Sequence, residues 1–385
     1  MELQELLKLA VERKASDLHI KVGSPPVLRI DDKLVPITEK PRITQEDAIR
    51  MAFSVMNSKQ KEKFKEHNEI DLAYSLPGLG RFRCNIFQQR STVGMVMRVI
   101  PIKIQTIPEL NLPQILEKLA LEPRGLLLVT GTTGSGKSSS LAAMIDQING
   151  HRACHIITIE DPIEFLHRDK KALVNQREVG TDTETFAEAL RSALRQDPDV
   201  ILVGEMRDYE TISTAIVAAE TGHMVMSTLH TVDAAETINR VISVFPPYQQ
   251  KQIRLQLAAV LKGIISMRLI PRADGKGRVP AVEVMIATAT IRECIVDPDK
   301  TRKIPEFVAA GSSQYGMQTF DQSLMVLYRR GLITYEEALL WSSNPDDFAL
   351  KVRGIESTTD QAWQATQTEG GGTKTAIPGL ERISG

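Results

Sequence analysis

The strongest constraint on the fold is a glycine-rich octapeptide, Gly131-Thr132-Thr133-Gly134-Ser135-Gly136-Lys137-Ser138, which matches the pattern GxxxxGK(S/T) in full. An apolar run at residues 126–130 leads into it, and a helical stretch follows at residues 139–148. The pattern forms a phosphate-binding loop when it joins a strand to a helix, and both neighbours are of the required kind. A glycine-rich turn that matches by chance is the alternative, but it leaves this agreement of strand, motif and helix unexplained.

The chemistry of such a loop assigns roles to its residues. Backbone N–H groups curl around phosphates, and the following helix points its positive N-terminal end at them. Lys137 is predicted to reach the β- and γ-phosphates of ATP and Ser138 to ligate Mg²⁺, so the predicted cofactors are ATP and Mg²⁺. The predicted nucleotide-binding residues of this segment are Gly131, Thr132, Thr133, Gly134, Ser135, Gly136, Lys137, Ser138 and Ser139.

Short, continuous apolar runs alternate with helical stretches after residue 125. They lie at residues 126–130, 155–159, 200–203 and 224–227. Runs of this kind are typical of parallel strands that are covered on both faces, and their alternation with helices predicts an α/β fold. Further helical stretches are predicted from about residue 288 to residue 341.

A carboxylate follows one of these strands at once, because Gly204 ends the run at 200–203 and Glu205 comes next. In a fold of this kind phosphates bind at the carboxyl ends of the parallel strands. Glu205 is therefore predicted to face Mg²⁺ or the attacking water, and its reach suits a catalytic base beside the γ-phosphate. A surface salt bridge with Arg207 is the competing interpretation.

A second acidic segment, Glu160-Asp161-Pro162-Ile163-Glu164-Phe165, follows the strand at 155–159. Three carboxylates this close repel one another unless a cation is near, and Mg²⁺ with a nucleotide would supply it. Glu164 is therefore predicted to join Glu205 and Lys137 as a catalytic residue. A solvated acidic turn is the alternative.

Two histidines bracket the strand at 224–227. His230 follows the carboxyl end, where it is predicted to sense the γ-phosphate. His223 stands at the opposite end, roughly 20 Å away at the rise of a strand, so the two cannot share a metal. His223 is predicted to contact another subunit or strand, and either histidine could instead be structural.

The N-terminal hundred residues predict a small α/β domain. A hairpin around Asp31-Asp32, a polar helical stretch at 45–66 and three strands at 70–75, 81–88 and 92–100 make up its pattern. Pro101, Pro108 and Pro113 predict a hinge at 101–113. The main domain is then predicted at 114–350, and the polar, glycine-containing segment at 351–385 is predicted to be disordered.

Composition excludes several classes of protein. The net charge of −1 argues against a general nucleic-acid binder. Three isolated cysteines, Cys84, Cys154 and Cys294, form no CxxC pair for zinc and fit a reducing cytosol. No apolar run is long enough to span a membrane. We therefore expect any membrane association to go through a partner.

Several stretches together resemble the type IV pilus retraction ATPases, the PilT/PilU family of the secretion-ATPase superfamily. Its Walker A, Asp, Walker B and His boxes correspond in order to 131–138, ITIEDPIEF at 157–165, DVILVGEMRD at 199–208 and GHMVMSTLHT at 222–231. ASDLHI at 15–20, GRFRCN at 80–85 and GMQTFDQ at 316–322 extend the resemblance over about residues 1–350.

This resemblance implies a PAS-like N-terminal domain, a RecA-like ATPase domain and a helical C-terminal region. It implies a homohexamer that is cytoplasmic and peripheral at the inner membrane, where it docks on the pilus platform protein. Arg83 and Arg98 correspond to the N-terminal arginines that bind the nucleotide in the family, and arginine suits phosphate because its planar fork binds two oxygens. A solvated strand face is the alternative for both residues.

The function predicted is an ATP-hydrolysing motor for pilus retraction and twitching motility. A short N-terminal region and the missing CxxC motif favour retraction over pilus assembly. The stretch at 290–297 keeps part of a PilT motif, so the PilT type is favoured over the PilU type, although the tail and LYRRGLITYEEAL lean towards PilU. A non-hydrolysing regulatory paralogue and a DNA-translocating or conjugation ATPase are the alternatives.

Overall fold

The computed structural model describes residues 1–30, 33–100 and 104–354. The described chain forms two compact units. The first comprises Met1–Gln105 and Asn149–Ala193, and the second comprises Thr106–Ile148 and the described residues from Leu194 onward. Nearly all of the segment predicted to be disordered, and part of the predicted hinge, lie outside the described residues.

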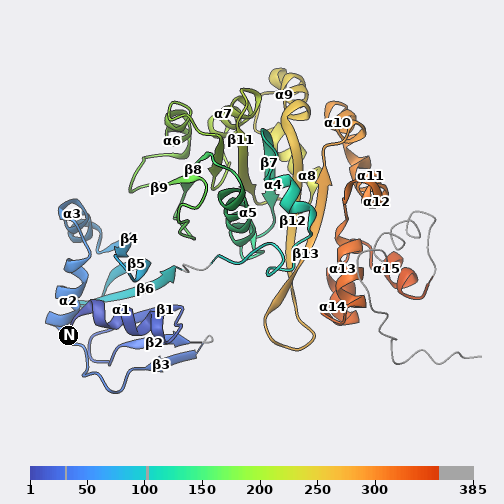
Figure 1. Cartoon of the computed structure of the whole chain (residues 1–385). Helices are drawn as coiled ribbons and strands as arrows, with labels where there is room; N and C mark the ends of the chain where they lie inside the picture. Colours follow the sequence, from blue (N-terminus) through green and yellow to red (C-terminus); the bar gives the residue numbers. More distant parts are fainter. Residues whose placement is uncertain (31–32, 101–103, 355–385) are drawn as a thin grey trace, which may run out of the picture. The chain divides into compact units, whose positions relative to one another are not determined.

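An antiparallel sheet with three helices makes up the N-terminal part of the first unit (Figure 1). Its strand order is β3-β2-β1-β6-β5-β4. The strands are β1 Asp17–Ile20, β2 Val27–Ile30, β3 Lys33–Pro36, β4 Glu69–Leu76, β5 Gly80–Gln89 and β6 Thr92–Ile100. The helices are α1 Leu3–Glu12, α2 Gln45–Ser54 and α3 Ser58–His67. The apolar side of α1, with Leu3, Leu6, Leu7 and Ala10, is buried in the core of this part, as helical spacing requires.

The prediction of one helical stretch at 45–66 was wrong in detail, because the segment forms two helices. α2 ends at Ser54, and Asn57 then starts α3 by accepting a hydrogen bond from the Gln60 N–H at 2.9 Å. The Gln60 side chain accepts in return from the Asn57 N–H, which completes a capping box. These caps satisfy backbone groups that one continuous helix would have paired internally.

The remainder of the first unit contains a parallel pair, β8 His155–Glu160 and β9 Leu173–Glu178, and helix α6 Phe186–Ala193. β8 was predicted, whereas β9 was not. The sequence of β9, LVNQRE, alternates poorly and is mostly polar, so apolar periodicity does not reveal it.

The second unit is built on strands in the order β13-β12-β7-β11-β10. They are β7 Gly125–Thr130, β10 Val200–Val203, β11 Met224–Leu229, β12 Leu261–Pro271 and β13 Arg278–Ile286. β10, β11, β7 and β12 are parallel, and β13 pairs antiparallel with β12. Every residue of β7, β10 and β11 is buried, which explains their continuous apolar sequence.

The long β12–β13 hairpin was not predicted (Figure 1). β12 begins at Leu261, directly after helix α9 ends at Val260, so no turn residue separates the two elements. Apolar residues then run through both elements, and a helix-to-strand change inside such a run has no local signal.

Further helices lie in the described part of the chain. They are α4 Ile115–Ala120, α5 Lys137–His151, α7 Tyr209–Glu220, α8 Ala234–Ser243, α9 Pro247–Val260, α10 Ala289–Val296, α11 Ile304–Ala310, α12 Ser312–Tyr315, α13 Phe320–Arg329, α14 Tyr335–Trp341 and α15 Pro345–Val352. The last three share a core with the β12–β13 hairpin, in which Phe320, Leu324 and Phe348 pack with Ile270 and Val279. The α/β class and the helical C-terminal region are therefore confirmed. Within the described ranges, no helix has both the length and the apolarity to cross a membrane.

Candidate active site

The phosphate-binding loop lies between β7 and α5 in the second unit, as the motif predicted. Gly131, Gly134 and Gly136 have φ values of 140°, 77° and 99°, which residues with a Cβ rarely adopt. A Cβ on Gly131 would lie 2.5 Å from the Met267 carbonyl oxygen and 2.6 Å from the Ser135 Oγ. Glycine is therefore required at 131 for space as well as for backbone angle.

Lys137 is the first residue of α5, and its ammonium group turns back over the loop. Nζ donates hydrogen bonds to the carbonyl oxygens of Gly131 at 2.7 Å and Thr132 at 3.0 Å. The side chain is only 9% exposed. A buried ammonium group held by two loop carbonyls at a helix N-terminus is placed to meet a phosphate with little rearrangement.

The loop also contains a polar atom that lacks a partner. Ser135 is 3% exposed, and its hydroxyl makes no hydrogen bond with the described residues. A buried hydroxyl without a partner is costly and indicates a ligand that supplies one. Together with the glycine backbone and Lys137, this hydroxyl fits a phosphate chain. Ser138, the second residue of α5, is partly exposed and could ligate the Mg²⁺ that accompanies the phosphates.

Glu205 lies one residue beyond Gly204, at the carboxyl end of β10. Its Oε1 forms an ion pair with the Arg207 Nε and lies 3.1 Å from the His230 Nε2. The Glu205 side chain is 19% exposed, whereas that of Arg207 is 76% exposed. The salt bridge with Arg207 therefore exists. The other partner of Glu205, His230, is less exposed than Arg207, with 42% of its side chain accessible.

Two hydrogen bonds hold the loops that carry Glu205 and His230 together. The Thr228 hydroxyl donates to the Gly204 carbonyl at 2.6 Å, and the Met206 N–H donates to the Thr228 carbonyl at 3.2 Å. Because β7, β11 and β10 are adjacent parallel strands, their carboxyl ends present Gly131, His230 and Glu205 at one edge. The sequence placed all three at this edge, but it did not reveal the contact between Glu205 and His230 or the role of Thr228.

His223 lies at the opposite end of β11, as predicted, but its contacts are local. Its Nδ1 lies 2.8 Å from the Ala218 carbonyl oxygen and 3.2 Å from the Thr221 hydroxyl. Its own carbonyl accepts from the Gly125 N–H at 3.0 Å. These bonds join the end of α7 to the start of β7, which supports the structural interpretation of this histidine.

The acidic segment at the end of β8 belongs to the first unit, and its carboxylates differ in burial. Burial raises the pKa of Glu160, whose Oε1 accepts from the Thr158 hydroxyl at 2.7 Å and the Gln176 amide at 3.1 Å. Glu164 is exposed, and its N–H donates to Glu160 at 3.4 Å. Within this segment, the exposed carboxylates of Asp161 and Glu164 are therefore available for a ligand or for solvent.

Arginines form a row across the N-terminal sheet of the same unit. Arg83 stands opposite Arg98 in the β5–β6 pair, and Arg98 stands opposite the buried Asp17 of β1. The Arg98 Nε donates to Asp17 at 3.0 Å, and the Arg29 Nε lies 3.8 Å from the same carboxylate. The Asp17 carboxylate thus contacts two of the three guanidinium groups, and the like charges of Arg83 and Arg98, directly opposite each other, are destabilising. The row is suited to binding a further anion.

Arg83 is exposed and lines a cavity of about 630 Å³ within this unit, together with Asp161 and Thr181. Arg81, two residues earlier on β5, is instead paired, because its Nη2 donates to the buried Glu178 at 2.9 Å. Glu178 also accepts from the Ile163 N–H at 3.1 Å, next to the acidic segment. Sequence reasoning did not select Arg81 or Glu178, and a single Glu in a polar strand offers no signal.

Comparison with known proteins decides the family. The profile of the family described as type II/IV secretion system protein matches residues 2–330. The chain belongs to this family. Two relatives from Pseudomonas aeruginosa cover nearly its whole length. PilT, described as a type IV pilus retractation ATPase, is 47% identical over 90% of this chain and 100% of its own. PilU, a type IV pilus ATPase, is 43% identical over 95% of this chain and 96% of its own.

A solved structure supports the fold of this type II/IV secretion system protein. The crystal structure of the pilus retraction motor PilT with bound ADP has a TM-score of 0.83 and 46% identity, and it covers 90% of this chain and 98% of the other. The predictions of a PilT/PilU-type secretion ATPase and of its fold class are therefore confirmed. The roles of individual site residues stay predictions.

Proposed function

We propose that the chain is an ATP-hydrolysing motor that powers the retraction of type IV pili and twitching motility. The observation that carries this proposal is the shared edge of β7, β11 and β10, where the phosphate-binding loop, His230 and Glu205 meet in one unit. The similarity to PilT over 100% of that protein's length supports the step from a nucleotide site to a retraction motor.

The loop binds the phosphates of ATP. Residues 131–139 surround them, Lys137 exchanges its bonds to the Gly131 and Thr132 carbonyls for the β- and γ-phosphates, and Ser138 holds Mg²⁺. Bound Mg²⁺ neutralises phosphate charge. The Ser135 hydroxyl, which lacks a partner among the described residues, gains one from the ligand.

Glu205 acts as the base that orients and deprotonates the attacking water. Its carboxylate is fixed by Arg207 and His230 at a strand end, and a fixed base needs little reorganisation in the transition state. His230 contacts the γ-phosphate and links its presence to the Glu205 carboxylate. Glu164 supports the water or the metal shell, since its carboxylate is exposed, as is that of Asp161, whereas Glu160 is held by Thr158 and Gln176.

Arg83 and Arg98 bind nucleotide phosphates from the N-terminal domain. The repulsion between these cross-strand partners, and the exposure of Arg83, support this role. The domain limits 1–100 and 114–350, joined by a hinge at 101–113, are part of the same proposal.

The working assembly is a homohexamer in the cytoplasm, docked on the pilus platform protein at the inner membrane. The PilT type is preferred to the PilU type, in line with 47% against 43% identity. Light scattering with Mg²⁺ and nucleotide should show six subunits, and a chain that stays monomeric under every nucleotide condition would contradict the ring.

The experiment that tests the function is deletion of the gene, scored for pilus number and twitching, together with ATP hydrolysis by the purified chain. Excess pili without movement and a measurable ATPase rate are expected. An inactive chain would favour a regulatory paralogue. Salt-dependent binding to DNA would favour a DNA-translocating ATPase.

A further inference from the structure

A buried carboxylate outside the nucleotide site, that of Glu283, belongs to a polar row across three strands. Thr130 at the end of β7 is the register partner of Ser266 on β12, and Ser266 is the partner of Glu283 on β13. The Thr130 hydroxyl donates to the Ser266 Oγ at 3.1 Å, and the Ser266 hydroxyl donates to the Glu283 Oε1 at 3.3 Å. Thr130 and Ser266 have no exposed surface, and Glu283 is 6% exposed.

The row continues into a helix. The Glu283 Oε1 also accepts from the Ala234 N–H at 2.8 Å, and Ala234 is the first residue of α8. A carboxylate at a helix N-terminus is stabilised by the unpaired N–H groups there. Through this bond, Glu283 is joined to the first residue of α8, next to the N-cap residue Asp233.

Both ends of the row adjoin the candidate active site. Thr130 directly precedes Gly131, the first residue of the phosphate-binding loop, and Ala234 follows His230 by four positions. Packing of the apolar hairpin alone would not require an acid at 283, and an isolated buried charge is costly. The presence of this acid therefore calls for a role that its hydrogen bonds can serve.

We propose that Glu283 is a positioning residue for ATP hydrolysis, which holds the phosphate-binding loop and the start of α8 in one geometry. This inference rests on the proposed ATPase function. Glu283 does not touch the nucleotide. It acts through Thr130 on the loop and through Ala234 on the segment that carries His230.

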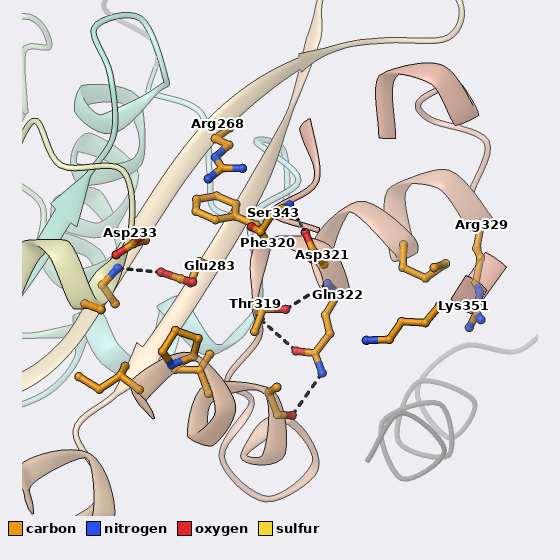
Figure 2. Close-up of a pocket in the computed structure, with 17 residues that line it drawn as sticks. Asp233, Arg268, Glu283, Thr319, Phe320, Asp321, Gln322, Arg329, Ser343 and Lys351 are labelled. Carbon is orange, nitrogen blue, oxygen red and sulfur yellow. Dashed lines mark hydrogen bonds between the residues drawn. The ribbon is translucent and has the colours of Figure 1, made fainter. Parts of the chain in front are cut away.

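Solvent reaches Glu283 from a cavity of about 320 Å³ between the hairpin and the C-terminal helices (Figure 2). Figure 2 shows Asp233 beside Glu283, and Arg268 over the ring of Phe320, 3.8 Å from its centre. The charged groups that face this cavity from β12, α8, α13 and α15 are Arg268, Asp233, Asp321, Arg329 and Lys351.

The pKa of Glu283 is raised to about 7, mainly by burial and in part by Asp233, against the lowering by the Ala234 N–H, Ser266 and Arg268. The carboxylate is therefore charged above neutral pH and protonated below it. Because the positioning bonds are strongest to the charged form, their contribution should grow as the pH rises through 7.

The test compares the full-length protein with Glu283→Gln, which keeps size and acceptor but removes charge. We expect kcat for ATP to fall about tenfold at pH 8, with KM changed less, because misplacement of reacting groups acts mainly on turnover. The ratio of wild-type to variant kcat should approach one at pH 5.5 and rise with a midpoint near pH 7.

Two further variants separate positioning from stability. Ser266→Ala removes the bonds of its hydroxyl with Thr130 and with Glu283 but leaves the bond from the Ala234 N–H to Glu283. Its effect should not add to that of Glu283→Gln in the double variant. Asp274→Asn removes an exposed carboxylate from the same hairpin and should leave kcat unchanged.

Three outcomes would overturn the inference. Unchanged kcat in Glu283→Gln would do so, as would a pH-independent loss or a loss that parallels a fall in melting temperature. Lack of ATPase activity in the wild type would refute the proposed function and this inference with it, and the wild-type rate shows which of the two has failed.

Discussion

The sheet that carries the phosphate-binding loop and the N-terminal sheet place their polar residues differently. β7, β10 and β11 are buried along their whole length, and their chemistry begins where each strand ends, at Gly131, Glu205 and His230. β5 alternates between buried and exposed positions, and its arginines stand within the strand.

This difference follows from how each sheet is covered. A parallel sheet with helices on both faces has no solvated position along its strands, so ligands can be met only at strand ends. An antiparallel sheet keeps one face open, so side chains at every second residue can meet a ligand. The strand-end site is hence formed by loops that follow the strands, whereas the arginine row is formed by side chains that the strand register places opposite one another.

The strand-end site should fail completely when its fixed cation is removed. Lys137→Ala should abolish detectable ATP turnover, because the β- and γ-phosphates lose the ammonium group that neutralises them. A coupled assay on the purified chain measures this, with Lys276→Ala, on the exposed hairpin turn, as the control. Near-normal rates in Lys137→Ala would contradict the nucleotide site.

Glu205→Gln should reduce single-turnover hydrolysis by about 10²–10⁴-fold while ATP affinity survives, because the amide keeps size and some hydrogen bonding but cannot act as a base. Glu164→Gln should be milder. If the two exchanged severity, Glu164 would be the base. A Glu205→Gln variant with the wild-type rate would leave Glu205 as no more than a partner of Arg207 and His230.

The difference in burial between the two sheets can be tested by measuring the free energy of unfolding of variants. Ile201→Ala, in the middle of the fully buried β10, should lower the free energy of unfolding by about 2–5 kcal/mol, because it leaves a cavity. Leu34→Ala, at a 55% exposed position of β3, should change it by less than about 0.5 kcal/mol. Urea titration monitored by circular dichroism compares the two, and similar losses would remove the distinction.

The arginine row should show the smallest effect. Arg83→Ala should lower kcat/KM for ATP by about ten- to 100-fold, the value of hydrogen bonds to a charged group. Arg98→Ala should also cost stability, since the buried Asp17 loses its 3.0 Å partner. Arg90→Ala, at the exposed β5–β6 turn, is the matched control. Kinetics for Arg83→Ala identical to those of Arg90→Ala would support a solvated strand face.

Much of the strand-end site could be predicted from the sequence, because its signals are local. The loop at 131–138 carries strand, glycines and helix within about 25 residues, and Glu205 follows its strand directly. The C-terminal helices from Thr288 onward were also recovered, since helical periodicity is a local pattern. The two helices at 45–66 were merged because the Asn57 cap was overlooked.

Tertiary structure alone decided what depends on register between distant segments. The contact of Glu205 with His230, the opposition of Arg83 and Arg98, and the row from Thr130 through Ser266 to Glu283 join residues that no local pattern connects. The sequence by itself determined which strands are followed by functional side chains, because the apolar runs that form buried strands and the polar or turn residues that end them are visible in the local sequence. Which ends then meet is set by strand order and pairing, since the pairs named above join residues that lie 15 to 136 positions apart in the chain.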